Sequence, residues 1–254
     1  MKIFGLIKVR NESLIMQDTL DHWAKVCTGG IYVYDDVSTD NTVEICEKHP
    51  AVNEVVKGKI WDHDREKAEW FNRQTILTRA QRDANKDDWF VYFDADERMF
   101  FNDWSLLFQP AVEAIACRLY DVFITPEDEG KPYNVRNWVG PEFRTIVFFF
   151  RNNEYVSYDK PDQRIVNLRP DAKVVIAGII KHYGKGLSVQ HWEDTCDYYI
   201  TFWPKYAEKW KARKGKAVKI DYKSDFNNPL IKFNDVLSGR AEGFSLEQQT
   251  YGRK

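Results

Sequence analysis

The chain has 254 residues, of which 43% are hydrophobic and 15% aromatic, and this is enough apolar material for one large domain core. Its formal net charge of −2 lacks the basic excess that is typical of nucleic-acid-binding proteins, so we expect no nucleic-acid partner. No apolar run approaches the ~20 residues that a membrane-spanning helix needs. The four cysteines show no metal-binding spacing, and the N-terminus lacks a signal-peptide pattern, so we expect reduced thiols in a cytoplasmic protein.

The first hundred residues alternate between predicted strands and predicted helices. Apolar runs predict strands at residues 3–9, 31–34, 52–56 and 89–93, and helical spacing predicts helices at residues 14–26, 40–48 and 64–84. This order implies a mostly parallel central sheet with helices on both faces, which is the α/β class. In such a sheet, ligands bind at the carboxyl ends of the strands.

After residue 98 the pattern becomes mixed. Further strands are predicted at residues 114–119, 122–125, 145–150, 155–158 and 173–177, with a long loop at 126–140 that could serve as a lid. A helix is predicted over 192–212, with aromatic residues at helical spacing and Pro204 as a possible kink. The basic stretch from 206 onward predicts a helical C-terminal extension, either as an ordinary solvated helix or as a peripheral contact with a membrane surface.

An acidic stretch follows the predicted strand at 89–93. Asp94 and Asp96 are two residues apart, so on a continuing strand their carboxylates point the same way. Such carboxylates would repel each other unless a cation lay between them, and a hard divalent cation prefers oxygen ligands. The alternative is a polar strand end followed by a turn.

Three stretches in chain order resemble the motifs of family 2 glycosyltransferases with the GT-A fold, a Rossmann-like fold for nucleotide-diphospho-sugar transfer. They are Val-Arg-Asn-Glu at 9–12, Tyr-Asp-Asp-Val-Ser-Thr-Asp-Asn-Thr at 34–42 and Asp-Ala-Asp-Glu at 94–97. Each follows a predicted strand, and the last is similar to the metal motif of one subgroup. Beyond residue 98 the resemblance is thinner, with Phe143-Arg144 and His182-Tyr183 as landmarks.

The resemblance implies roles for the strand-end residues. Arg10 and Asn11 would lie beside the nucleotide, and Asp35 or Asp36 would accept a hydrogen bond from its base. Asp96 and Asp94 would hold Mn²⁺ or Mg²⁺ on the diphosphate of a nucleoside-diphosphate sugar. The same resemblance puts Arg73 near the donor, although it could be a solvated charge on a polar helix.

Two later positions remain open. His182 could complete the metal sphere, as a late histidine does in many GT-A enzymes, or could bond to backbone at a strand end. An inverting transferase also needs a carboxylate near the acceptor hydroxyl, for which Asp121 is our first candidate and Asp162 our second. The sequence determines neither inversion nor retention.

We therefore expect a metal-dependent glycosyltransferase that moves a sugar from a nucleoside-diphosphate donor to a hydroxyl acceptor on a glycan or glycoconjugate. Residues 1–205 would form the GT-A domain, with a donor and metal half at 1–110 and an acceptor half at 111–205, and residues 206–254 would pack on it. The alternatives are a non-catalytic nucleotide- or sugar-binding module and a sugar nucleotidyltransferase. The latter is disfavoured because the loop after the first strand lacks glycine.

Overall fold

A computed structural model describes residues 1–101, 103–161 and 164–246. The chain forms two compact units that are interleaved along the sequence. The first unit comprises Met1–Cys117 and Ile146–Ala177, and the second comprises Arg118–Thr145 and Gly178–Lys254. The strands are hydrogen-bonded in the order β3-β2-β1-β4-β7-β6-β8-β5, and each unit is described below by itself.

The sheet of the first unit contains four neighbouring parallel strands, as the sequence predicts. They are β1 (Ile3–Val9), β2 (Gly30–Asp35), β3 (Val52–Lys57) and β4 (Trp89–Tyr92). β1 pairs with β2 and β4, with Phe4 opposite both Gly30 and Phe90. Because all of these strands run in the same direction, their carboxyl ends meet at one edge of the sheet.

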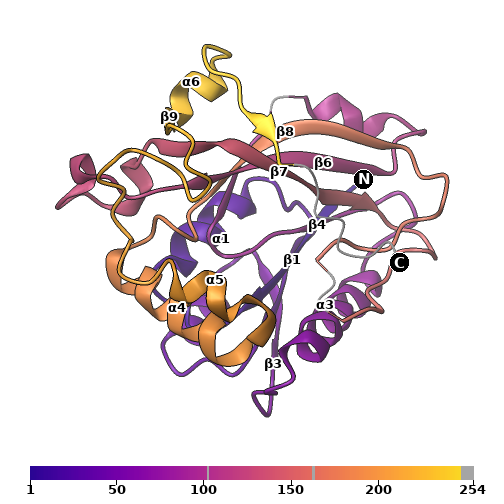
Figure 1. The fold of residues 1–254 in the computed structure, drawn as a ribbon. Helices are drawn as coiled ribbons and strands as arrows, with labels where there is room; N and C mark the ends of the chain where they lie inside the picture. The colour runs from indigo at the N-terminus through magenta and orange to yellow at the C-terminus, as the bar shows by residue number, and fades with distance from the viewer. Residues whose placement is uncertain (102, 162–163, 247–254) are drawn as a thin grey trace. The chain divides into compact units, whose positions relative to one another are not determined.

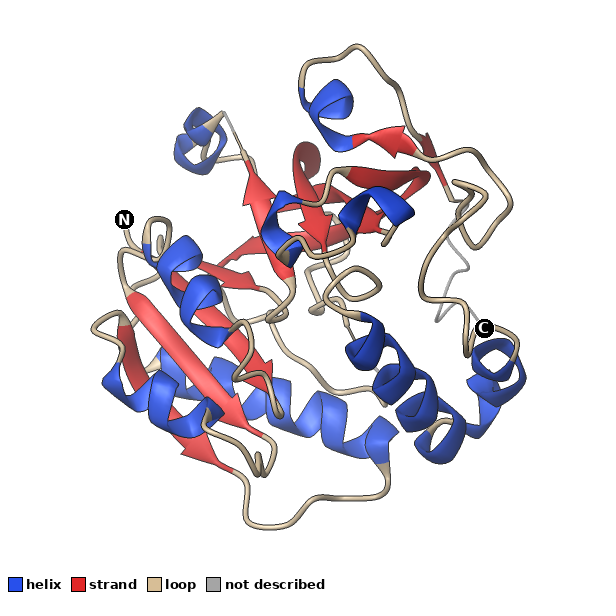
Figure 2. Ribbon diagram, turned by 90° about the vertical axis from the view of Figure 1, so that its left-hand side faces the viewer, coloured by secondary structure: helices blue, strands red, loops and turns tan. Residues whose placement is uncertain are grey.

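Helices cover both faces of this sheet (Figure 2). They are α1 (Met16–Ala24), α2 (Thr42–Lys48) and α3 (Arg65–Gln81). The buried side chains of α3, Ile76 and Leu77 among them, join one core cluster with the alternate strand residues Phe4 and Leu6. On the opposite side, the ring of Trp23 in α1 stacks on that of Phe93 at 4.2 Å between centroids. Both apolar faces of the strands are thereby buried, which explains their near-continuous apolar sequences.

Four strands come next after β4, of which β6, β7 and β8 are longer than predicted and β5 was not predicted. They are β5 (Glu97–Phe100), β6 (Ala114–Val122), β7 (Trp138–Arg151) and β8 (Val174–His182). β6 contains the strand predicted at 114–119 and continues through the polar residue Asp121 to Val122. The strand predicted at 122–125 was wrong, since only an isolated bridge from Ile124 to Val218 follows β6 there. The predicted strand at 155–158 was wrong, since that stretch has only an isolated bridge from Ser157 to Asn167.

The second unit ends in short elements. They are α4 (Val189–Phe202), the 3-10 helix η4 (Pro204–Tyr206), α5 (Ala207–Lys211), β9 (Ile231–Lys232), α6 (Phe233–Leu237) and β10 (Phe244–Ser245), most of which are labelled in Figure 1. The single helix predicted at 192–212 is divided at Pro204, which has no N–H for the helical ladder. The rings of Tyr199 and Trp210 still stack across the break at 4.4 Å. Within the described residues, no helix combines the length and the apolar character needed to cross a membrane.

Candidate functional site

Two loops at the carboxyl ends of β1 and β2 are joined by hydrogen bonds. Arg10 donates from Nη1 to the backbone oxygens of Asp36 at 2.7 Å and Val37 at 2.9 Å. Asn11, at a φ of 54°, accepts at Oδ1 from the N–H of Thr39 at 2.7 Å. These contacts bring the two predicted nucleotide-binding stretches together at one edge of the sheet.

Trp61 adds an aromatic surface to this edge. The guanidinium carbon of Arg10 lies 4.5 Å from the centroid of the Trp61 ring, and that of Arg65 lies 5.1 Å from it. Trp61 precedes α3, and the sequence analysis did not select it. Its ring contacts Arg10, which lies in one of the loops that the resemblance assigns to the nucleotide.

The two aspartates after β2 are bound within the protein. Asp35 accepts from the N–H of Ser38 at 3.2 Å and thereby shapes the turn. The buried carboxylate of Asp36 pairs with Arg65 of α3, and Lys8 Nζ lies 3.7 Å from its Oδ2. Asp36 therefore holds α3 against the sheet edge, in addition to any contact with a base.

Arg73 belongs to a buried ion network on the same side of the sheet. Its Nη2 lies 2.9 Å from Glu69 Oε2, and its guanidinium carbon lies 5.2 Å from the centroid of the Tyr92 ring. Burial alone would raise the pKa of Glu69, but Lys8 and Arg73 outweigh this effect and lower that pKa to about 2. Glu69 is therefore a permanent anion, and Arg73 is part of the buried network instead of a solvated charge.

The acidic stretch lies after β4, as predicted. Arg164 spans its carboxylates, with Nη1 3.3 Å from Asp94 Oδ1 and Nη2 2.9 Å from Glu97 Oε1. Glu97 also accepts at Oε2 from the backbone N–H of Asp94 at 2.7 Å, which fixes the turn. Asp94 and Asp96 are both partly exposed, so they are accessible from solvent at the ligand edge of the sheet.

Glu12 is a further carboxylate of this edge that sequence reasoning missed. Burial, and then the negative charges of Asp96, Asp94 and Asp40, raise the pKa of Glu12 well above its ordinary value. The strand-end rule could have found Glu12, because it follows Arg10 in the loop after β1. The same rule could not have found Arg164, which comes from a distant segment.

This crowding of carboxylates is suitable for a divalent cation. Oxygen ligands of like charge repel each other when no cation is present, and Mg²⁺ or Mn²⁺ would relieve that repulsion. Within residues 1–101, 103–161 and 164–246, no three histidine, cysteine or acidic side chains are arranged to hold a metal by themselves.

In the second unit, Asp121 lies at the end of β6 and bonds to His182 at the end of β8. Its Oδ1 is 2.6 Å from His182 Nδ1 and 2.6 Å from Arg144 Nη2, and its Oδ2 is 2.8 Å from Lys185 Nζ. Burial would raise the pKa of Asp121, but Arg144, Lys185 and His182 lower it well below its ordinary value. Asp121 is thus ionised, as a base must be, although these partners reduce its affinity for a proton.

Of the predicted site residues, Arg10, Asn11, Asp35, Asp36, Arg73, Asp94 and Asp96 lie in the first unit. Asp121 and His182 lie in the second unit, where they contact each other. Asp162, the second candidate for the base, lies outside the described residues. The base and the histidine ligand remain predictions.

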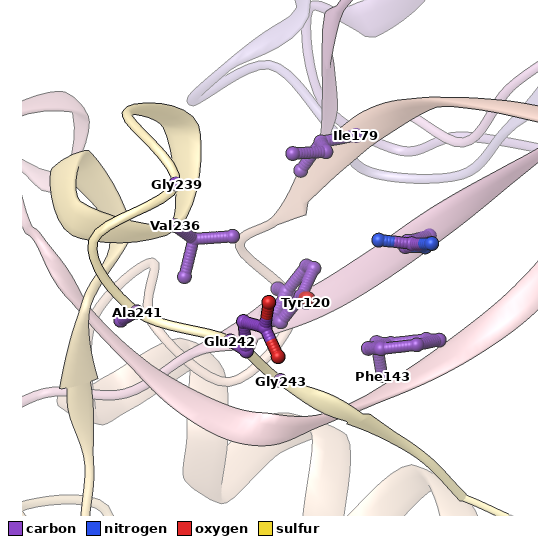
Figure 3. A pocket seen from close by; sticks show the side chains of 9 residues that line it. Tyr120, Phe143, Ile179, Val236, Gly239, Ala241, Glu242 and Gly243 are labelled. Carbon is purple, nitrogen blue, oxygen red and sulfur yellow. The ribbon is translucent and has the colours of Figure 1, made fainter.

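The second unit also contains a cavity of about 330 Å³, shown in Figure 3. Tyr120 of β6, Phe143 of β7 and Ile179 of β8 line one side, and the chain from Val236 to Gly243 lines the other. Neighbouring residues of a strand face opposite sides, so Tyr120 and Phe143 face this cavity while Asp121 and Arg144 face away. Aromatic rings with a nearby guanidinium and carboxylate, here Arg118 and Glu242, form a surface on which a sugar ring could stack.

The fold and the strand-end motifs together define a glycosyltransferase of the GT-A type. The chain matches the family described as Glycosyl transferase family 2 over residues 6–163. This match covers more than half of the chain, which therefore belongs to that family.

Two curated relatives, from Mycobacterium bovis and Mycobacterium tuberculosis, are 34% identical to the chain over 99 residues. Both are described as uncharacterized proteins, and the match covers 38% of this chain. The aligned part spans only 23% of the relatives' length.

The chain also matches solved structures at low identity. One is TarS 1–349 from S. aureus in complex with UDP, at 13% identity and a TM-score of 0.43, covering 84% of this chain and 71% of that one. Another is glucosyl-3-phosphoglycerate synthase from Mycobacterium tuberculosis with Mn²⁺, UDP and glucosyl-3-phosphoglycerate, at 17% identity and a TM-score of 0.31. That likeness covers 46% of this chain and 44% of that one.

Proposed function

We propose that the protein transfers a sugar from a nucleoside-diphosphate donor to a hydroxyl acceptor with the help of a divalent cation. The observation that carries this proposal is the single sheet edge that holds Arg10, Asn11, Asp36, Asp94 and Asp96 at successive strand ends. The first unit would bind the donor, and the second unit would bind the acceptor. A cytoplasmic location agrees with four buried, unpaired cysteines.

Each residue at the edge would have a separate task in this reaction. Asp94 and Asp96 would hold Mn²⁺ or Mg²⁺, a Lewis acid that offsets the charge on the departing nucleoside diphosphate. Arg10 and Trp61 would position the nucleotide, and Arg164 would keep Asp94 and Glu97 in place when no donor is bound. Asp121 would accept the proton of the acceptor hydroxyl.

The first test measures binding without catalysis. Melting curves are recorded with a panel of nucleoside diphosphates, UDP among them, with and without Mn²⁺. A ligand at a hundred times its dissociation constant stabilises the folded state by about 2.7 kcal/mol. Stabilisation by nucleoside diphosphates that requires Mn²⁺ supports the donor site, and a panel without any stabilisation would refute it.

The second test is the substitution Asp96→Asn, which keeps the side-chain volume and removes the charge. We expect turnover to fall at least about 10³-fold and Mn²⁺ to lose its effect on nucleotide binding. The melting temperature without metal should stay equal or rise slightly, because like charges repel there. Asp87→Asn is the matched control, since Asp87 is exposed and precedes the amino end of β4, whereas the proposed site lies at the carboxyl ends of the strands.

The products separate the alternatives. Release of a nucleoside diphosphate identifies a glycosyltransferase, and release of pyrophosphate would identify a nucleotidyltransferase. Binding without any turnover would identify a non-catalytic module. Wild-type turnover of Asp96→Asn, or of the wild type in excess EDTA, would exclude the cation from the mechanism.

A further inference from the structure

The second unit contains a chain of ion pairs that begins at Asp121 and ends at Asp225. Lys185 joins the two carboxylates, with Nζ 2.8 Å from Asp121 Oδ2 and 3.0 Å from Asp225 Oδ2. Asp225 lies in the loop between α5 and β9, so the ion pairs connect this loop with the distant strand β6 that contains Asp121. Both carboxylates are shared among several cations.

Asp225 is the more deeply buried of the two, with 2% of its side chain exposed. Arg213 Nη2 lies 2.9 Å from its Oδ2 and Lys219 Nζ lies 2.7 Å from its Oδ1, in addition to Lys185. Burial opposes ionisation, but these cations lower the pKa of Asp225 to about 2. One carboxylate therefore faces three cations and cannot neutralise them all.

Two more cations lie at the open side of this cluster. Arg144 pairs with Asp121 but keeps 44% of its side chain exposed. Lys209 of α5 is exposed, and no carboxylate within the described part of the chain lies at ion-pair distance from it. Helical hydrogen bonds from Ala212 to Glu208 and from Lys214 to Trp210 place Lys209 one turn before Arg213, which pairs with Asp225. The charges of Arg213, Lys185 and Arg144 accordingly act with partial burial to lower the pKa of Lys209.

The result is a local positive excess on a chain whose net charge is −2. The nearby acids offset only part of this excess, because Asp197 pairs with a further cation, Lys214, and Glu193 adds a single negative charge that accepts from the N–H of Gly215. The ammonium groups of Lys185 and Lys219 lie over the ring of Phe123, at 5.0 and 5.4 Å from its centroid. Like charges held together on a packed surface attract a counter-anion.

We propose that Arg144 and Lys209, supported by Lys185 and Arg213, bind a phosphate group on the acceptor. The acceptor would then be a soluble phosphorylated alcohol or sugar. This inference rests on the proposed function, because it names the acceptor class of the same reaction. The exposed guanidinium of Arg144 and the exposed ammonium of Lys209 are the charge-assisted donors that a phosphate monoester requires.

The test titrates inorganic phosphate against chloride at matched ionic strength and measures the increment in melting temperature. Four proteins are compared: wild type, Arg144→Gln, Lys209→Gln and Lys211→Gln. Lys211 is the matched control, because it lies on α5 as well but pairs with Glu208 and is exposed. The increment is compared with each variant's own melting temperature in chloride, which separates phosphate binding from any loss of folding.

We expect saturable stabilisation of the wild type and of Lys211→Gln. In Arg144→Gln and in Lys209→Gln, the dissociation constant for phosphate should rise about tenfold, which corresponds to about 1.4 kcal/mol. Absence of saturation in the wild type, or equal weakening in Lys211→Gln, would overturn the inference. Binding to anionic lipid vesicles that depends equally on Lys209 and Lys211, without saturable phosphate binding, would overturn it as well.

Nucleotide binding is measured in the same four proteins. If the wild type binds nucleoside diphosphates, but neither Arg144→Gln nor Lys209→Gln changes the dissociation constant for phosphate, this inference alone is refuted. A protein that binds no nucleotide refutes the proposed function, and in that case the phosphate titration still decides whether the cluster binds an anion. Unchanged nucleotide affinity in Arg144→Gln would show that the phosphate effect does not come from the donor site.

Discussion

Both units bury charged side chains near strand ends, but they balance those charges differently. In the first unit, Asp36 and Glu69 face Lys8, Arg65 and Arg73, and each anion contacts at least two of these cations. In the second unit, Asp225 contacts three cations, while Lys209 nearby has none of the carboxylates of the described chain within ion-pair distance. The first network is nearly neutral and suited to holding a fixed shape, whereas the second has a surplus that suits an incoming anion.

The largest effect on stability is expected for Asp225→Asn. The substitution leaves Lys185, Arg213 and Lys219 without their shared anion, and breaking a buried ion pair typically costs about 3–5 kcal/mol. Unfolding in urea measures this loss. The control is Asp221→Asn, an exposed position four residues earlier, which should change the free energy of unfolding by less than about 0.5 kcal/mol. Equal values for the two variants would mean that Asp225 does not hold the cluster together.

A smaller loss is expected for Asp36→Asn. Arg65 would lose its closest anion but would keep Glu69 Oε1 at 3.5 Å, so we expect a cost of about 1–3 kcal/mol in the free energy of unfolding. The exposed Asp87→Asn again serves as the control in urea unfolding. A loss as large as that of Asp225→Asn would show that the first network has no spare anion, and the contrast between the units would disappear.

The smallest effect concerns pH. His22 accepts from the N–H of Met99 at 2.9 Å, and burial, followed by the charges of Arg98 and Lys25, lowers its pKa to about 4. Because the unfolded chain binds this proton near pH 6.5, the stabilisation is complete above that pH and is lost as the pH falls toward 4. The carboxylate of Asp225, with its pKa of about 2, keeps its stabilising charge across this window.

The matched variant for this prediction is His22→Gln, whose amide oxygen can still accept from Met99. Its free energy of unfolding should change less between pH 6.5 and 4 than that of the wild type. If the free energy of unfolding of His22→Gln depends on pH as that of the wild type does, His22 is not the titrating group, and another residue causes the acid sensitivity.

The sequence predicted the part of the site that follows local rules. Asp36, Asp94 and Asp96 each follow an apolar strand by one to four residues, so the strand pattern alone puts them at one edge of the sheet. Arg65 and Arg164 could not be predicted, because their partners depend on how α3 and the segment after β7 pack. A short motif encodes a position along a strand but not the partner of a side chain across the fold.

The second unit shows the same limit more strongly. Asp121 was selected as a lone acid within an apolar run, and nothing in its neighbours along the chain indicated Lys185 or Asp225. The division of the predicted helix at 192–212 also depends on packing, since Tyr199 and Trp210 remain stacked across the break. Long-range charge pairs of this kind require the coordinates.

The interleaving of the two units constrains the order in which the chain can fold. The first unit needs residues 146–177, so during synthesis it cannot be completed until a segment of the second unit, residues 118–145, has already left the ribosome. That segment must wait for residues from 178 onward before its own unit can form. No single cut of the gene yields either unit whole, and separate expression of the two requires that segments be rejoined in a new order.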